Sequence, residues 1–202
     1  LGALGVLLTV TIQCVPRFAL HAVEAPVPLA EVLDTYVERN EQHDHFEFYC
    51  LPHTESTRTK TNTRFPIDYP TKPLSTAARL LDEEVMNNAM LGAVVGFQRF
   101  FPSFTPPINR AIEAVSSRRD YSDESHRVFV TRRRVRFREM EYSLPLESIP
   151  EVMRDLQRLI ERKQFRVSFP VEVRTAKADD VWLSTASGRQ SGYIAVHRYW
   201  RD

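Results

Sequence analysis

Cysteine, unbalanced charge and long apolar runs are all scarce in this sequence, and each absence narrows what the protein can be. Cys14 and Cys50 are the two cysteines among 202 residues, and they show no Cys-x-x-Cys spacing. The sequence therefore predicts two buried free thiols rather than a disulfide framework or a cysteine metal site. The formal net charge of +1 gives no general attraction to nucleic acid or to anionic membranes.

The apolar stretch that opens the chain runs for about ten residues, whereas a membrane-spanning helix needs about 20. A signal peptide would have a basic start and a small-residue cleavage site, and neither is clear here. Gly2 and Gly5 followed by residues 6–12 instead predict a turn that leads into a buried strand. The chain looks cut from something longer. The expected location is the cytoplasm, with membrane association left open.

Signatures of several enzyme classes are missing as well. The sequence contains no Gly-x-Ser-x-Gly motif, no P-loop and no dinucleotide-binding fingerprint. His43-Gln-Asp-His45 offers suitable metal ligands, but no further ligand follows at metal-site spacing, so we interpret it as a loop leading into a strand. Arg132-Arg133-Arg134 is followed by Arg136 and Arg138, which alternate with Val135 and Phe137, and this alternation favours the solvent face of a strand over phosphate binding.

Hydrophobic periodicity predicts two units with the order strand–helix–strand, in which each helix is long enough to cross over a sheet. The first unit covers residues 18–24, 28–40 and 45–50, and the second covers 134–144, 146–163 and 167–174. Elsewhere we predict strands over 126–131 and 192–199, helices over 76–101 and 108–117, an edge strand or loop over 54–63, a loop over 118–125, and a loop or short helix over 176–189. These elements indicate an α+β fold, a mixed or antiparallel sheet with helices on one face.

One strand carries the residues that point most directly to chemistry. Alternation places Val171 and Val173 on one face, and Glu172 and Arg174 on the other. A carboxylate and a guanidinium side by side, with roughly 6–7 Å between their Cα atoms, form a hydrogen-bonding platform for a polyhydroxylated ligand. An ordinary ion pair on a solvated strand face explains the same spacing.

Two further strands carry polar residues on one face. Glu139 and Glu141 share a face of one strand, and His197 and Tyr199 share a face of another. If these strands lie beside the strand that holds Arg174, the three faces form a single polar wall, which marks a binding site because buried polar groups need partners. The alternative is that these faces contact water, and the residues alone do not decide between the two.

Five motifs, in their order and spacing, resemble one enzyme family. The sequence is similar to the C-terminal part of the FAD-linked sugar-1,4-lactone oxidases and dehydrogenases, such as the D-arabinono- and L-gulono-lactone enzymes, with the alditol oxidases as relatives. The motifs are Phe137-Arg-Glu-Met-Glu-Tyr-Ser-Leu-Pro145, Phe169-Pro-Val-Glu-Val-Arg174, Asp179-Asp-Val-Trp-Leu-Ser184, Gly188-Arg189 and Tyr193-Ile-Ala-Val-His197.

The resemblance implies a flavoenzyme of the vanillyl-alcohol-oxidase type, in which an N-terminal domain holds FAD and a cap domain supplies the substrate wall. Residues 1–15 then correspond to the last strand of an otherwise absent FAD-binding domain. Residues 16–202 correspond to the cap, truncated at its C-terminus. The family's His-Trp-Gly-Lys motif, which carries a flavin-facing lysine, is missing, so we expect activity in the parent enzyme and not in this piece alone.

By motif, the resemblance also implies roles for individual residues. Arg174 would stabilise the substrate alkoxide and the reduced flavin, while Glu172 would bind substrate hydroxyls and hold Arg174 in place. The backbone of Val6 would contact FAD. Further substrate contacts are implied at His197, Glu139 and Tyr199.

The reaction implied by the family is oxidation of a CH–OH group of a sugar lactone or polyol by hydride transfer to the flavin, with oxygen or another electron acceptor. A flavin performs the redox step itself, and the protein supplies orientation and electrostatics. Two alternatives stay open. One is an inactive, truncated homologue, and the other is a non-catalytic α+β interaction domain whose polar strand face binds a partner.

Overall fold

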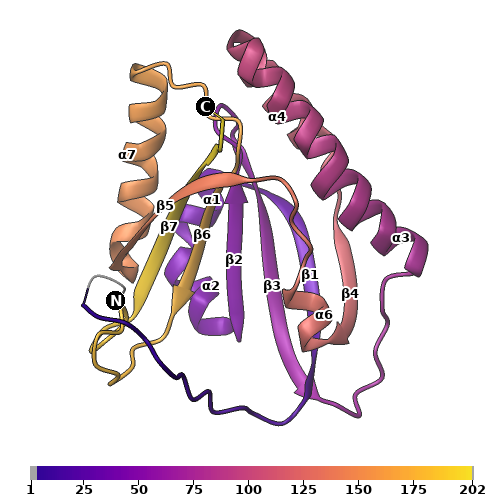
Figure 1. Cartoon of the computed structure of the whole chain (residues 1–202), viewed down its shortest axis with the longest axis vertical. Helices are drawn as coiled ribbons and strands as arrows, with labels where there is room; N and C mark the ends of the chain where they lie inside the picture. Colours follow the sequence, from indigo (N-terminus) through magenta and orange to yellow (C-terminus); the bar gives the residue numbers. More distant parts are fainter. Residues whose placement is uncertain (1–3, 202) are drawn as a thin grey trace.

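A single antiparallel sheet forms the centre of the computed structural model, which describes residues 4–201. Its strands hydrogen-bond in the order β4-β1-β3-β2-β6-β7-β5 (Figure 1). They are β1 (Phe18–Pro28), β2 (His45–Cys50), β3 (Ser56–Pro66), β4 (Arg119–Glu124), β5 (Phe137–Pro145), β6 (Val171–Ala176) and β7 (Ser191–Tyr199). The predicted fold class, an antiparallel sheet with helices, is confirmed.

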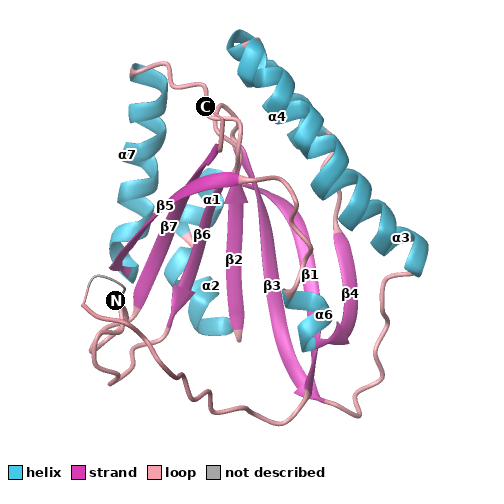
Figure 2. Cartoon of the chain, viewed as in Figure 1, coloured by secondary structure: helices cyan, strands magenta, loops and turns pink. Residues whose placement is uncertain are grey.

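Helices connect the strands and cover mainly one face of the sheet (Figure 2). A long helical rod, made of α3, the π-helix η1 and α4, runs alongside β4 (Figure 1). The α-helices are α1 (Leu29–Asp34), α2 (Tyr36–Gln42), α3 (Thr76–Leu80), α4 (Leu91–Phe100), α5 (Thr105–Ala114), α6 (Ser125–Phe129) and α7 (Ile149–Arg162). The other helical segments are η1 (Leu81–Met90), η2 (Pro102–Phe104) and η3 (Leu146–Ser148).

The main hydrophobic core lies between the sheet and the helices α1, α2 and α7. Helix α7 is amphipathic, with a proline in its first turn and Glu151 and Arg162 at the ends where their charges complement the helix dipole. On the sheet side, alternation along β2 buries every second residue. The core includes Leu29, Val32, Leu33, Tyr36, Phe46, Phe48, Ile149, Met153, Val171, Val173 and Ile194.

The sheet is nearly symmetric about the boundary between β2 and β6. Strand β3 lies between β1 and β2, which α1 and α2 connect, and β7 lies between β5 and β6, which α7 connects. Each half is therefore a split β-α-β unit with one strand inserted. The two predicted strand–helix–strand units are confirmed, and the strand that follows each unit fills the gap between its two strands.

Some predicted segments are wrong. The threonine-rich segment forms β3 in the interior of the sheet, because Thr57 and Thr59 donate hydrogen bonds to the carbonyls of Val27 and Ala25 and so can face the core. Residues 118–125, predicted as a loop, contain β4, and residues 126–131, predicted as a strand, contain α6. The chain from 130 to 136 is not a strand, so the arginine run there is not a strand face.

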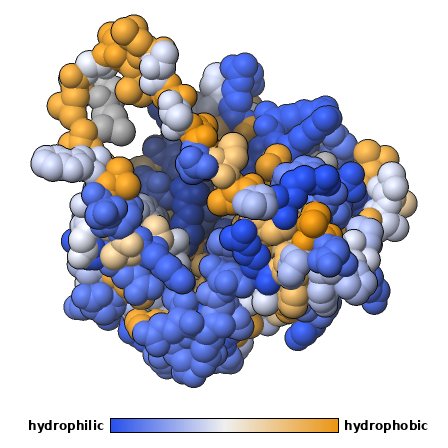
Figure 3. All heavy atoms as spheres, turned by 90° about the horizontal axis from the view of Figure 1, so that it is seen from below, coloured by the Kyte–Doolittle hydropathy of each residue, from blue (hydrophilic) through white to orange (hydrophobic). Residues whose placement is uncertain are grey.

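The predicted strand over residues 6–12 is also wrong. Residues 5–17 form no strand, and their apolar side chains are exposed, because no other described strand lies beside them to complete their hydrogen bonds. In the view from below, exposed apolar side chains project as an arc, and the surface beside the arc is hollowed with hydrophilic walls (Figure 3). The assignment of residues 1–15 to a neighbouring domain stays a prediction, and residues 1–3 lie outside the described residues.

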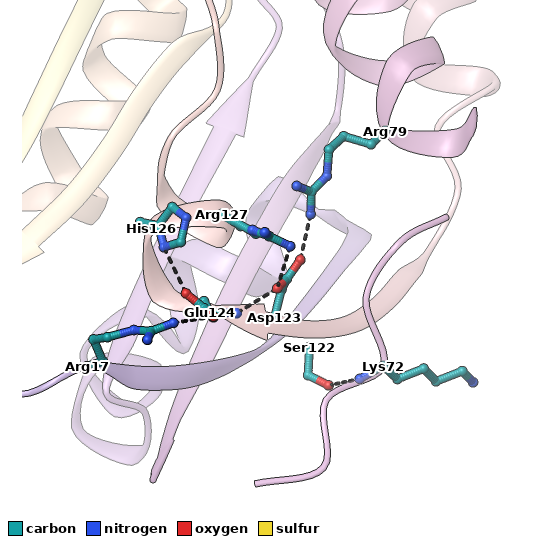
Figure 4. A network of polar contacts seen from close by, with 8 residues as sticks. All are labelled: Arg17, Lys72, Arg79, Ser122, Asp123, Glu124, His126 and Arg127. Carbon is teal, nitrogen blue, oxygen red and sulfur yellow. Dashed lines mark hydrogen bonds and ion pairs between the residues drawn. The ribbon is translucent and has the colours of Figure 1, made fainter. Parts of the chain in front are cut away.

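A network of ion pairs fastens the edge strand β4 to the rest of the molecule (Figure 4). The carboxylate of Asp123, which is buried, contacts Arg79 of α3 at 2.6 Å and Arg127 of α6 at 3.8 Å. The neighbouring Glu124 contacts Arg17 at 2.5 Å, just before β1. A hydrogen bond from Arg17 lowers the pKa of Glu124. Two helices and the segment before β1 therefore meet at the end of β4.

None of the helices within the described residues is both long enough and apolar enough to cross a membrane.

Helix α7 packs so closely on β7 that Gly192 has no room for a side chain. A Cβ atom at Gly192 would lie 2.3 Å from Cγ1 of Ile149, which is fully buried. We expect Gly192→Ala to lower the free energy of unfolding by about 1–3 kcal/mol, the usual cost of overpacking. Gly96→Ala in α4 is the control, because nothing lies within 4 Å of its Cβ position, and it should be neutral or stabilising by up to about 1 kcal/mol. Urea unfolding followed by circular dichroism distinguishes the two outcomes, and equal effects would contradict the packing described for α7.

The two cysteines differ, so the prediction of two buried thiols is half wrong: Cys50 is buried and Cys14 is exposed. Burial raises the pKa of the Cys50 thiol to about 12. At pH 8 only about one molecule in ten thousand then carries the reactive thiolate at this position. We expect iodoacetamide to label Cys14 in the native protein and Cys50 only after unfolding, as peptide mass spectrometry would report. Rapid native labelling of Cys50 would contradict its burial.

Candidate active site

Three neighbouring strands bring the predicted site residues onto one face of the sheet. Glu139 of β5 lies directly opposite His197 of β7. Glu172 of β6 lies opposite Ala195 of β7, which also faces Glu141 on the other side. Because paired residues of adjacent strands point to the same face, the predicted polar wall is confirmed as an arrangement.

The closest partner of Arg174 is Glu141, not Glu172. Nε and Nη2 of Arg174 donate to Oε1 of Glu141 at 3.0 and 2.7 Å. The distance from Nη1 to Oε1 of Glu172 is 3.8 Å, which is too long for a hydrogen bond. Strand β7 lies between Arg174 of β6 and Glu141 of β5, and the residue of β7 opposite Glu141 is the small Ala195. Glu172 therefore contacts Arg174 as a longer ion pair, and its expected role in holding Arg174 in place stays a prediction.

The charge of Arg174 is secured by its surroundings. Burial lowers the pKa of Arg174, but the hydrogen bonds that Arg174 donates to Glu141 and the negative charges of Glu141, Glu172 and Glu139 together raise it above its ordinary value. The side chain of Arg174 remains 48% exposed. A permanently charged guanidinium therefore faces outward from a wall of carboxylates, with donors to spare for a ligand.

His197 is buried and oriented by its neighbours. It is 5% exposed, and its ring lies edge-on to Phe137 at 4.9 Å. Its Nδ1 lies 3.0 Å from the carbonyl oxygen of Pro170. Since a carbonyl only accepts hydrogen bonds, Nδ1 carries a proton in this arrangement, and Nε2 points toward Glu139, 3.5 Å from Oε2.

The other two predicted residues lie further from this centre. Tyr199 shares the face of His197 but lies one strand step beyond it, opposite Phe137, with its ring 6.4 Å from that of Trp200. Val6 lies on the exposed N-terminal segment with 87% of its surface accessible, and the structure does not bring it to the polar wall.

Sequence reasoning missed part of the wall. Glu141 was recognised as sharing a face with Glu139, but its bond to Arg174 depends on strand pairing that no local pattern predicts. Tyr49 of β2 lies directly opposite Glu172, and Glu47 lies one step along the same face. The alternation of β2 already separates these two residues from its buried apolar ones. What could not be known was that β2 pairs with β6.

Oxygen and nitrogen groups of many kinds meet on this face, but they do not form a metal site. Among the side chains that the structure describes, no group of three histidine, cysteine or carboxylate residues is arranged to hold a metal ion. The wall instead combines one guanidinium, one imidazole and several carboxylates. Such a set can bind vicinal hydroxyl groups, stabilise negative charge on an oxygen, and accept a proton.

Two relatives of this chain carry the names of lactone oxidoreductases. L-gulono-1,4-lactone dehydrogenase of Mycobacterium tuberculosis is 39% identical over 199 residues, which cover 98% of this chain and 46% of that protein. L-gulonolactone oxidase of Bos taurus is 30% identical over 202 residues, which cover 98% of this chain and 45% of that protein. The chain thus spans less than half the length of these relatives.

A solved structure of cholesterol oxidase from Brevibacterium sterolicum matches with a TM-score of 0.66 and 14% identity, covering 92% of this chain and 43% of that one. At this identity the likeness concerns the fold alone. The profile of the D-arabinono-1,4-lactone oxidase family matches residues 10–202. This match and the relatives named as lactone oxidoreductases show that the chain belongs to the D-arabinono-1,4-lactone oxidase family.

Proposed function

We propose that this chain is the substrate domain of an FAD-dependent oxidoreductase. Its substrate would be a sugar-1,4-lactone of the D-arabinono or L-gulono type, or a related polyol, and a CH–OH group would be oxidised. The electrons would pass to oxygen or to another acceptor. The single observation that carries the proposal is the half-exposed guanidinium of Arg174 held among the carboxylates of Glu141 and Glu172 in a member of this family.

Arg174 has the main electrostatic role. Oxidation of an alcohol removes a hydride from the carbon and a proton from the hydroxyl oxygen. If the proton leaves before the hydride, negative charge develops on that oxygen. A fixed cation in a site with little water stabilises this charge most effectively when it needs no reorientation. The bond to Glu141 supplies that fixed position, and the remaining N–H groups of Arg174 would donate to the substrate oxygen.

Glu172 and His197 complete the proposed chemistry. The carboxylate of Glu172 is largely buried and not hydrogen-bonded to Arg174, so it is placed to accept bonds from substrate hydroxyls. His197 would receive the hydroxyl proton at Nε2, because Nδ1 already donates to the Pro170 carbonyl, and Glu139 would stabilise the resulting imidazolium. Tyr199 is a proposed outer substrate contact.

The polar residues of this face suit the substrate side of a flavin site and do not suit the binding of the FAD pyrophosphate. Bound FAD would supply the acceptor for the hydride. The residues described here suit the substrate side, since they are hydroxyl-binding and charge-stabilising groups. The sequence lacks the glycine-rich fingerprint that would bind a pyrophosphate. A backbone contact between Val6 and FAD is part of the proposal, because this exposed segment is free of the sheet in this structure.

We expect Arg174→Ala to reduce kcat/KM for L-gulono-1,4-lactone by about 100- to 1,000-fold in the flavin-loaded, full-length enzyme that contains this chain, because a positioned charge is lost. Arg174→Lys should recover only part of this loss, since lysine lacks the fork geometry. The measurement is the rate at which lactone bleaches the flavin absorbance without oxygen. Arg154→Ala, which removes an exposed ion pair with Asp34, is the control. An unchanged rate in Arg174→Ala would favour the non-catalytic interaction domain.

The bond between Arg174 and Glu141 gives a second expectation. Glu141→Gln should lower kcat by about tenfold, because the guanidinium of Arg174 is then no longer held in one position relative to the substrate. The free energy of unfolding should change by less than about 1 kcal/mol, because the ion pair is half exposed. The Nε signal of Arg174 in ¹⁵N NMR should move in this variant and stay in place in Glu151→Gln, an exposed control on α7. A moved signal with unchanged kcat would remove Glu141 from the mechanism.

A further inference from the structure

Because the two halves of the sheet are built alike, each residue of the proposed site on β6 has an equivalent residue on β2. Pro28 and Pro145 end the outer strands β1 and β5, and they lie opposite Ser56 and Ser191 of the inserted strands. If the Pro28–Ser56 pair is superposed on the Pro145–Ser191 pair, the strand pairing makes Phe48 of β2 equivalent to Val173 of β6. Glu47-Phe-Tyr49 is then the counterpart of Glu172-Val-Arg174, an acid followed two residues later by a large hydrogen-bonding side chain.

These two pairs are also neighbours. Tyr49 lies directly opposite Glu172 across the β2–β6 boundary. Adjacent strands are about 4.8 Å apart, a distance that spans roughly four carbon–carbon bonds of an extended sugar chain. A ligand whose hydroxyl is bound by Glu172 would therefore present its next carbons toward β2.

The carboxylates on the β2 side of the boundary, Glu24 and Glu47, differ in how many hydrogen bonds they accept from other side chains. Arg58 donates to Glu24 at 2.7 and 3.1 Å, and Tyr121 donates to the same carboxylate at 3.0 Å, so Glu24 serves the structure. Glu47 has a looser contact, 3.9 Å from Nζ of Lys60, whose ammonium donates to the Val128 carbonyl at 2.9 Å. Glu47 therefore keeps carboxylate oxygens for a ligand.

A strap of chain closes this side of the wall. Residues 130–136 run from α6 to β5 in front of the sheet (Figure 1). Asn88 of the π-helix η1 fixes the strap at two points, donating to the carbonyl of Arg132 at 2.9 Å and accepting from the backbone N–H of Arg134 at 2.6 Å. Burial raises the pKa of Tyr49, and Arg133, which the strap holds between these two points, lowers it through its charge and a side-chain hydrogen bond. Helix η1 therefore holds the segment that brings Arg133 to Tyr49.

We propose that Glu47 and Tyr49 form a second hydroxyl-binding subsite, which recognises the part of the sugar beyond the hydroxyl held by Glu172 and so sets the substrate length that the enzyme prefers. A phenol and a carboxylate on one face bind adjacent hydroxyls as donor and acceptor. Burial raises the pKa of both groups, and for Tyr49 the charges of Glu47 and Glu172 raise it further, so the phenol keeps its proton and can donate. This subsite rests on the proposed function.

The test compares substrates that differ by one CH–OH group. In the full-length, flavin-loaded enzyme, kcat/KM is measured for L-gulono-1,4-lactone and for the shorter D-arabinono-1,4-lactone. We expect Tyr49→Phe and Glu47→Gln each to lower the ratio of the longer to the shorter substrate by about tenfold, because a site that loses a hydrogen-bonding partner loses discrimination for that group. Calorimetry of L-gulono-1,4-lactone with the flavin-free protein should show weaker binding by a similar factor.

Tyr142→Phe is the matched control, since Tyr142 lies on the opposite face of β5 and is 59% exposed, and it should change neither the ratio nor the affinity. If both lactones are oxidised and Tyr49→Phe lowers both rates equally, the subsite is wrong while the proposed function stands. If the wild-type enzyme oxidises neither lactone, the proposed function is wrong. Calorimetry then judges the subsite separately: unchanged affinity in both variants overturns it, and weakened affinity supports it.

Discussion

The antiparallel pairing of β2 with β6 is the constraint on which the rest of the structure depends. It joins two split β-α-β units into one sheet through the paired residues Phe48–Val173, Tyr49–Glu172 and Cys50–Val171. On one side of this boundary, Phe48 and Val173 are fully buried and merge the two apolar layers into one core. On the other side, the same register places Tyr49 next to Glu172. A shift of the β2–β6 register by one residue would move the apolar side chains to the polar face and the polar side chains into the core. The core that stabilises the fold therefore also fixes the geometry of the polar face.

Energetics explains why that polar face is ordered in advance. Burying charged groups costs several kcal/mol per ion unless they are paired and hydrogen-bonded. The domain meets this cost by pairing: Arg174 with Glu141 across Ala195, His197 between the Pro170 carbonyl and Glu139, and Arg58 with Glu24. The pair of Arg174 with Glu141 contributes little net stability, because Arg174 is half exposed to water. The value of these pairs is positional, because each bond holds a side chain at a fixed place and orientation before any ligand arrives.

Local patterns in the sequence predicted the elements whose physical cause is local. Strand β2 and helix α7 follow from the alternation of Phe46 and Phe48 and from the apolar stripe around Met153. Contacts between distant segments were beyond reach: β4 is a polar strand that exists because it pairs with β1, and α6 packs Val128 on Leu20. The N-terminal apolar segment shows the reverse case. It has strand-like composition, but a strand needs a neighbour, and the described residues offer none.

The same division applies to the site. Alternation sufficed to place Glu172 and Arg174 on one face and His197 on another strand, and family motifs suggested that these faces meet. The identity of the partner of Arg174 was not accessible, because Glu141 lies 33 residues away in sequence and reaches Arg174 across the intervening strand β7. The sequence distance between cooperating charges is set by topology and not by local periodicity. The fold shared with cholesterol oxidase at 14% identity does not set the chemistry of this face, and under the proposed function the side chains on β2, β5, β6 and β7 would specify the substrate.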